Sequence, residues 1–370
     1  MKLTMRLKLQ PTLEQSDALL ETMKAFNAAC NHISQIAFLS KTYGKYDLQK
    51  TCYYHIRETF KLSAQMAVRV IGRVTETYKR DRKKQHVFRP DAAMVLDNRL
   101  LSYKSLDRAS ILTLGGRVTI PFILGGYGGE RLSLIKGEAD LIYRDGQFFL
   151  LQTVDLPEPP TINPDDFLGL DLGIVNIVSD SDGERHAGNA VNNVRHRAQH
   201  LRRKLQKTGT RPAKRLLKMR RRKETRFARD VNHCISKQLV NKAKDTGRGI
   251  ALEDLKGIRD RITARKPQRY RLHSWSFFQL RSFIAYKAKL AGVTVVAVDP
   301  RNTSRTCTSC GYVDKRNRPA QSLFLCVSCG FAGHADTIAA ENIRRAAINQ
   351  PNVDTAAYVV NYKPRQLAAG

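Results

Sequence analysis

Three acidic residues stand where a carboxylate is either costly or well placed for metal chemistry. Asp171 interrupts the otherwise apolar FLGLDLGIV, Glu253 ends the apolar run GIAL, and Asp336 opens a helical pattern. An ionised carboxylate in a buried strand needs a compensating partner. Acids whose mutual repulsion is relieved by Mg²⁺ are what two-metal phosphodiester hydrolysis requires. These three residues are therefore candidate catalytic groups and Mg²⁺ ligands.

Each acid also has a purely structural interpretation. Asp171 can accept backbone hydrogen bonds, Glu253 can pair with Lys256, and Asp336 can cap its helix. Caps and ion pairs are the commoner fates of single acids, but the combination favours catalysis. An acid in a strand before a hairpin, a second ending a later strand and a third opening a helix is the layout of RNase H-like nucleases.

Four cysteines form a second constellation. They make two CxxC pairs with 15 residues between them, and a glycine follows each pair: Cys307, Cys310, Cys326 and Cys329. Four sulfurs at this spacing suit a closed, structural, tetrahedral Zn²⁺ site, for which nearby His334 is not needed. An iron centre is the less favoured alternative. The odd total of seven cysteines argues against a disulfide framework, so Cys30, Cys52 and Cys234 are expected to be small buried residues.

The surrounding patterns indicate which elements position these groups. The alternating KLTMRLKLQPT predicts a half-buried strand, residues 12–86 follow a helical pattern, and short apolar runs over 88–155 predict an antiparallel sheet or small barrel. The first strand can join that sheet, which leaves the helices as an insertion. After the proline-rich boundary at 156–164 the pattern becomes α/β, with a mostly helical stretch over 190–248 and a final helix from about Asp336 to Ala347.

The charge balance points to a polyanionic partner. Sixty-four Lys and Arg against 33 Asp and Glu give a net charge of +31, and residues 195–229 hold 16 of the cations with one acid, Glu224. Such a surface fits nucleic acid, which releases counterions on binding. A run of 18 apolar residues and an apolar signal-peptide core are both missing, so we expect a cytoplasmic protein without membrane attachment. The candidate nucleic-acid contacts are Arg69, Arg73, Lys79, Arg80, Arg202, Arg203, Lys204, Arg220, Arg221 and Arg222.

Taken together, these motifs resemble one family. LDLGIVNI with SDG, IALEDLKGI, DPRNTSRTCTSCG and FLCVSCGFAGHADTIAAENI resemble the RuvC domain and zinc finger of TnpB, the transposon-encoded relative of type V CRISPR effectors. On this resemblance, Asp171, Glu253 and Asp336 match the catalytic carboxylates, and the four cysteines match the zinc ligands. One position departs from the D-x-N-A-A-x-N pattern of the last helix, because Ile338 replaces the first asparagine while Asn342 is kept.

The resemblance implies a multidomain α+β fold and an RNA-guided, Mg²⁺-dependent DNA endonuclease. The implied partners of this monomeric ribonucleoprotein are a guide RNA from the transposon end and double-stranded DNA carrying a short adjacent motif. The alternatives are a nuclease-inactive, guide-directed repressor, which loss of an acid would mark, and a DNA transposase that acts without RNA. The implied domains are a wedge β-barrel (1–11 and 88–160), a helical recognition insertion (12–87), a RuvC-like nuclease (165–300 and 334–348), a zinc finger (301–333) and a flexible tail (349–370).

Overall fold

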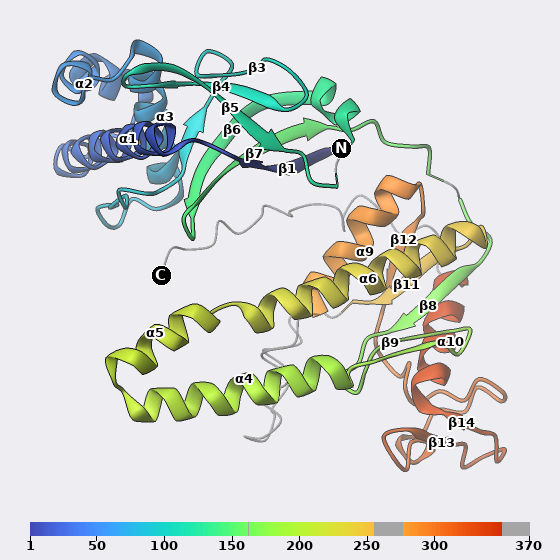
Figure 1. Cartoon of the computed structure of the whole chain (residues 1–370). Helices are drawn as coiled ribbons and strands as arrows, with labels where there is room; N and C mark the ends of the chain where they lie inside the picture. Colours follow the sequence, from blue (N-terminus) through green and yellow to red (C-terminus); the bar gives the residue numbers. More distant parts are fainter. Residues whose placement is uncertain (127, 162, 255–276, 350–370) are drawn as a thin grey trace. The chain divides into compact units, whose positions relative to one another are not determined.

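The computed structural model describes residues 1–126, 128–161, 163–254 and 277–349. The chain forms two compact units, Met1–Pro157 and Glu158–Gly370, which divide inside the proline-rich segment. Each unit has its own sheet and helices (Figure 1). The predicted tail over 350–370 and the suggested partner Lys256 lie outside the described residues.

The first unit is built on a seven-stranded antiparallel sheet with the order β2-β6-β7-β1-β5-β4-β3. The prediction that the N-terminal strand joins this sheet is confirmed, because β1 pairs with β7 over most of its length and with β5 at its end. Its side chains alternate as expected, with Met5, Leu7 and Leu9 buried. The seven strands are β1 (Lys2–Leu9), β2 (Met94–Leu96), β3 (Leu101–Tyr103), β4 (Arg108–Thr113), β5 (Gly116–Ile123), β6 (Ile135–Arg144) and β7 (Gln147–Asp155), with a 3₁₀ turn at Gly129–Leu134.

Three helices are inserted between β1 and β2, as the helical pattern predicts: α1 (Leu13–Leu39), α2 (Lys45–Phe60) and α3 (Ala64–Arg80). Helix α1 begins with a capping box, in which Thr12 and Gln15 satisfy each other's backbone N–H groups. Helix α3 buries the stripe Val70, Val74 and Tyr78. The buried Tyr78 hydroxyl and Ser34 of α1 hydrogen-bond at 2.9 Å, which ties α3 to α1.

The second unit has a five-stranded sheet with the order β10-β9-β8-β11-β12. Strands β8, β11 and β12 are parallel, whereas β9 pairs antiparallel with β8 and with β10. The predicted hairpin turn lies between β9 and β10, where Gly183 adopts a φ of +90°. The elements are β8 (Phe167–Asp171), β9 (Asn176–Asp180), β10 (Arg185–Ala187), α4 (Asn189–Thr208), α5 (Arg211–Arg220), α6 (Lys223–Asp245), β11 (Gly249–Glu253), α9 (Phe277–Ala291), β12 (Val295–Val298) and α10 (Ala335–Ile348).

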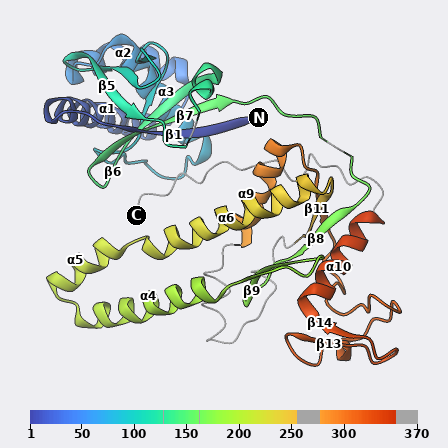
Figure 2. The ribbon, with the colours of Figure 1, turned by 45° about the vertical axis from the view of Figure 1, so that its right-hand side comes forward.

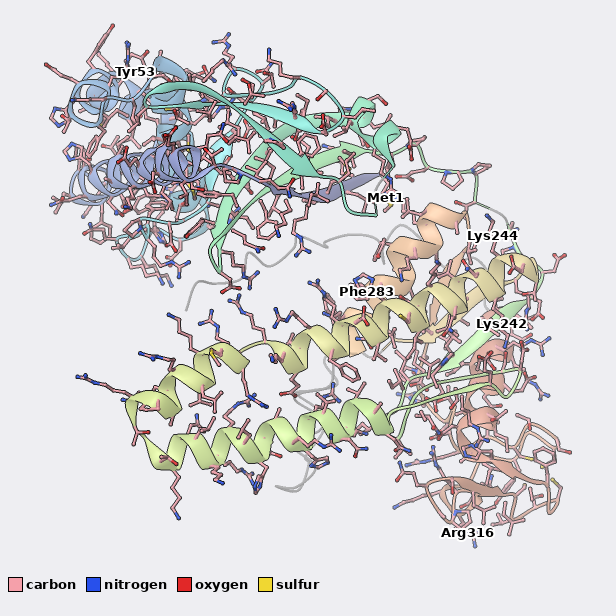
Figure 3. All side chains as sticks on the ribbon, in the orientation of Figure 1. Met1, Tyr53, Lys242, Lys244, Phe283 and Arg316 are labelled. Carbon is pink, nitrogen blue, oxygen red and sulfur yellow. The ribbon has the colours of Figure 1, made fainter. Side chains whose placement is uncertain are left out.

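Helices cover both faces of this sheet. Leu168 and Leu170 point into a core with α6 and α9, and their neighbour Phe167 packs on the other face against α10. Figure 2 shows α10 beside β8, opposite α6 and α9. Lys242 of α6, labelled in Figure 3, bonds the buried Asp180 at 2.5 Å, which fixes the hairpin to the helical layer.

A small finger connects β12 to α10, and it contains a two-stranded sheet of β13 (Leu323–Leu325) and β14 (Ala332–His334) with a 3₁₀ turn at Lys315–Asn317. Of the other cysteines, Cys30 and Cys52 are buried as expected, but the expectation for Cys234 is wrong, because it lies exposed on α6. None of the described helices is long and apolar enough to cross a membrane.

Candidate active site and metal centre

The sheet and α10 bring the three predicted acids to one region. Asp171 ends β8 and Glu253 ends β11, and these parallel neighbours are in register one residue earlier, at Leu170 and Leu252. Asp336 lies in the first turn of α10, the helix that packs on β8. Because parallel strands end at the same edge of a sheet, the first two carboxylates emerge side by side. Asp336 joins them from the helix.

The electrostatics show that the three acids interact. Burial raises the pKa of Asp171 to about 7, and repulsion from Glu253 and Asp336 adds to this effect. Burial also raises the pKa of Glu253. Carboxylates that must lose water beside one another favour a proton or a cation, because either reduces the repulsion. Carboxylate oxygens are the ligands that a hard divalent ion such as Mg²⁺ prefers, although those of the three acids do not all lie within 4.8 Å of one another in this structure.

Three residues that the sequence analysis did not single out hold two of these acids. Arg318 of the finger donates to Asp336 Oδ1 at 3.0 Å, and Asn176 of β9 donates to Asp336 Oδ2 at 2.9 Å. The Thr303 hydroxyl donates to Glu253 Oε1 at 2.5 Å. Asn176 had a sequence signal, as a polar residue inside the apolar GIVNIV. The other two had none, because only the tertiary fold brings them to the acids.

These contacts exclude one of the simple alternatives, the helix cap at Asp336, and leave the pairing of Glu253 with Lys256 untested, because Lys256 lies outside the described residues. Asp336 is not the helix cap, since His334 occupies the N-cap position and the Asp336 carboxylate faces Arg318 and Asn176. Glu253 is bonded by Thr303. The structure therefore brings the three predicted acids together, and their catalytic role stays a prediction.

The four cysteines converge as predicted. Within the described ranges they are the one group of three or more His, Cys, Asp and Glu residues whose ligand atoms all lie within 4.8 Å of one another. The Sγ atoms of Cys307 and Cys329 are 3.7 Å apart, and those of Cys310 and Cys326 are 3.6 Å apart. Sulfurs bound to tetrahedral zinc at about 2.3 Å would be about 3.8 Å apart. The cluster therefore fits Zn²⁺.

Backbone turns shape each cysteine pair for metal binding. Gly311 and Gly330 have φ values of +75° and +76°, and each donates its N–H to the first cysteine carbonyl of its pair at 3.0 Å. The N–H groups of Cys329 and Ser328 lower the pKa of Cys326 to about 7, which favours the thiolate that a metal needs.

Two residues join the finger to its surroundings. Asn317, fully buried, donates to the Arg305 and Tyr312 carbonyls and accepts from the Val327 N–H, which links the two cysteine turns. Ile338 packs in the apolar cluster with Cys307, Phe324, Cys326 and Ala335. Isoleucine in place of the family's asparagine at position 338 thus extends the apolar core of the finger onto α10.

The cationic stretch 195–229 forms a helical arm. Helix α4 runs out from the sheet, and α5 and α6 return to it, while many side chains along them end in nitrogen (Figure 3). Between the buried Arg195 and Ala228, only Ala213 is buried. Glu224, the single acid, pairs with Arg202 at 3.4 Å. An arm with so little apolar burial and so much positive charge suits a polyanion.

The predicted nucleic-acid contacts differ in their surroundings. The Arg69 guanidinium is already engaged in ion pairs, with Asp97 at 2.7 Å and with Glu138. Arg73 lies close enough to Asp140 to oppose the rise that burial causes in the pKa of that carboxyl. The others are exposed except for the half-buried Arg222: Lys79, Arg80, Arg202, Arg203, Lys204, Arg220 and Arg221. Their contacts with nucleic acid stay predictions.

Comparison with known proteins identifies relatives of this chain. Residues 277–343 match the family model described as Cas12f1-like, TNB domain. The chain is 41% identical over 129 residues to the CRISPR-associated endodeoxyribonuclease Cas12f1 of Sulfoacidibacillus thermotolerans, covering 35% of this chain and 28% of that protein. It is 37% identical over 122 residues to a TnpB-like protein of Methanocaldococcus jannaschii, covering 33% of this chain and 43% of that protein.

The matched stretches thus span less than half of these relatives. A structural match extends further, because a Cas12f1 in complex with single-guide RNA and target DNA covers 88% of this chain and 82% of its own, with a TM-score of 0.61 and 14% identity. At that identity the match concerns the fold. The resemblance of this chain to TnpB is confirmed, and about a third of the chain is similar in sequence to TnpB-like and Cas12f1 proteins.

Proposed function

We propose that this protein is an RNA-guided DNA endonuclease of a transposon. It would bind a guide RNA from the transposon end and cut matching DNA next to a short adjacent motif. The observation that carries this proposal is the convergence of Asp171, Glu253 and Asp336 at the end of two parallel strands and the start of α10, where their charges interact. The names of the relatives, among them a putative RNA-guided DNA endonuclease of Escherichia coli, support it.

In this proposal the second unit contains the RuvC-like nuclease, residues 165–300 and 334–348, with the zinc finger of 301–333 inserted. The first unit corresponds to a wedge β-barrel, 1–11 and 88–160, with the recognition helices of 12–87 inserted. The seven-stranded sheet interrupted by three helices supports the second assignment. The structural likeness to a Cas12f1 complex supports the combination.

The three carboxylates would hold the reaction's Mg²⁺. When bound, Mg²⁺ would supply Lewis-acid chemistry, which activates water and stabilises the leaving oxygen of the phosphodiester. Arg318 and Asn176 fix both oxygens of Asp336, so the carboxylate does not need to reorient when a substrate phosphate arrives. The positive charge of Arg318 also lowers the pKa of Asp171, which favours the anionic form of that carboxylate.

The cysteine cluster would hold a structural zinc ion, because its four sulfurs leave no open coordination position. The finger supplies Arg318 to the acids and leads directly into α10. Its role would therefore be to position residues rather than to react. The cationic arm would bind the phosphates of the guide RNA or of the guide–target heteroduplex.

The test is to co-express the chain with its flanking DNA, sequence the RNA that co-purifies, and offer a duplex that matches the RNA. The parent should cut the matching duplex in Mg²⁺, and Asp171→Ala should bind the same RNA and DNA without cutting. Guided binding without cleavage by the parent would support the repressor instead. A parent that carries no defined RNA would support the transposase.

A further inference from the structure

A contact outside the three acids determines how Glu253 is presented. The Thr303 hydroxyl donates to Glu253 Oε1 at 2.5 Å and also lies 3.1 Å from the Pro300 carbonyl. Thr303 is only 6% exposed, so water competes little for this bond. A hydrogen bond to one oxygen fixes the plane of a carboxylate while the other oxygen keeps its lone pairs for a cation.

Asn342 of α10 in turn holds Thr303. Its side-chain amide donates to two backbone carbonyls, those of Thr303 and Thr306, both at 2.8 Å. Asn342 is 9% exposed, and these two bonds use both hydrogens of its amide. Thr306 directly precedes Cys307, so the same amide also fixes the chain where it enters the first cysteine turn.

The two contacts form one connected path. Asn342 touches the backbone of residues 303–306, Thr303 touches Glu253, and the helix that carries Asn342 also carries Asp336. The orientation of Glu253 is thereby set from the element that supplies another acid of the site. A carboxylate held in this way binds a metal without first losing rotamer freedom.

We propose that Thr303 and Asn342 are positioning residues for Glu253, with Asn342 acting through Thr303. This inference rests on the proposed function only in taking Glu253 as a metal ligand. Loss of the Thr303 hydroxyl should weaken metal binding much more than it slows cleavage at saturating metal. Residues that orient a metal ligand typically change metal affinity on the order of tenfold or more when removed.

The first experiment measures Mn²⁺ binding to the full-length chain by electron paramagnetic resonance of the free ion. Binding lost in Glu253→Gln defines the site. Thr303→Val, which keeps the side-chain shape, should raise the half-saturating Mn²⁺ concentration about tenfold, and Thr303→Ser should restore the parental value. Thr306→Val is the matched control, because the Thr306 hydroxyl donates to the Asn302 carbonyl at 2.9 Å rather than to an acid, and it should leave the value unchanged.

The second experiment tests the order of the path. Asn342→Asp replaces two donors by acceptors and should weaken Mn²⁺ binding in the same direction, and the double variant with Thr303→Val should be no weaker than the weaker single variant. We term the action of Asn342 on Glu253 through Thr303 the relay. Three results would each refute it: additive losses of Mn²⁺ affinity in the double variant, a parental half-saturating concentration for Thr303→Val, or failure of Thr303→Ser to restore binding.

Cleavage by the RNA-bound chain separates the two proposals. If the parent cuts guided DNA and Thr303→Val needs about tenfold more Mg²⁺ to reach an unchanged maximal rate, both proposals hold. If Mn²⁺ binding shifts as expected but the parent cuts no guided duplex, the relay stands and the endonuclease function falls. If the parent cuts and Thr303→Val keeps the parental Mg²⁺ requirement, only the relay falls.

Discussion

Replacing Asp171 with Asn should make the protein more stable at alkaline pH in the absence of divalent ions, while abolishing cleavage. In the folded chain the pKa of Asp171 is about 7, against 3.8 for an unperturbed carboxyl. Because the folded pKa is the higher one, the stabilising contribution is complete below pH 3.8 and is lost as pH rises through 7. The amide side chain of the variant would carry no charge at any of these pH values.

The size of the effect follows from the two pKa values. Each unit is worth about 1.4 kcal/mol, so the full difference is about 4 kcal/mol, of which roughly 2.6 kcal/mol falls between pH 5 and pH 8. For a unit of this size that corresponds to about 5–10 °C in melting temperature. Mg²⁺ at about 100 times its Kd would return roughly 2.7 kcal/mol to the parent at pH 8 and much less to the variant.

The assay is calorimetric melting of the nucleic-acid-free, full-length chain from pH 5 to pH 8, with chelator and then with Mg²⁺. The quantity compared is the difference in melting temperature between parent and Asp171→Asn, in which the titration of groups remote from Asp171 cancels. Asp245→Asn, at an exposed acid that ends α6, is the matched control. If the melting temperatures of parent and Asp171→Asn change with pH in the same way across this range, burial and the neighbouring acids do not raise the pKa of Asp171 as the structure indicates.

Four further outcomes are expected. Cys326→Ser should abolish the bound zinc, measured by mass spectrometry of the metal, and should increase hydrogen exchange throughout the finger; retention of one zinc per chain would contradict the four-sulfur site. Arg318→Ala should slow guided cleavage at least tenfold and move the rising limb of its pH profile upward, because Arg318 lowers the pKa of Asp171 and anchors Asp336. Asp166→Asn should destabilise the chain by roughly 0.5–1 kcal/mol at pH 7, since Arg344 lowers the pKa of Asp166. Urea unfolding should show that this loss of stability shrinks below pH 3.8. A loss that does not depend on pH would argue against the ion pair. Replacing residues 202–204 with glutamine should reduce the steepness of the slope of log K for RNA binding against log salt concentration by about 2–3. An unchanged slope would show that these residues do not contact the RNA phosphates.

The cysteine site is the part of the structure that local sequence patterns predict most completely. The spacing of Cys307, Cys310, Cys326 and Cys329 specifies two tight turns that each present two sulfurs, and the structure has both. The sequence also marks the acids, because a carboxylate at the end of an apolar strand needs a partner whatever the rest of the fold is. Sequence patterns do not predict the full strand order, since β11, the parallel partner of β8, lies far along the chain.

What the sequence could not predict are contacts between side chains remote in the chain. Arg318 is one of several cations in the finger, and only the packing of the finger on α10 brings it to Asp336. Thr303 lies in a polar loop with nothing to distinguish it from Thr306 until the fold places Glu253 beside it. The exposed Cys234 shows that residue type alone does not predict burial, because burial also depends on which face of α6 meets the core.

Gly169, in the middle of β8, has a consequence for how this site tolerates change. A Cβ atom built there would lie 2.0 Å from the Ala340 carbonyl oxygen and 2.7 Å from the Arg344 nitrogen, both backbone atoms of α10. The helix therefore rests directly on the strand, backbone against backbone, two residues before Asp171. Any side chain larger than hydrogen would displace the helix from the sheet and carry Asp336 away from the other two acids. The separation of the acids is thus set by the absence of a side chain at a position that takes no part in the chemistry.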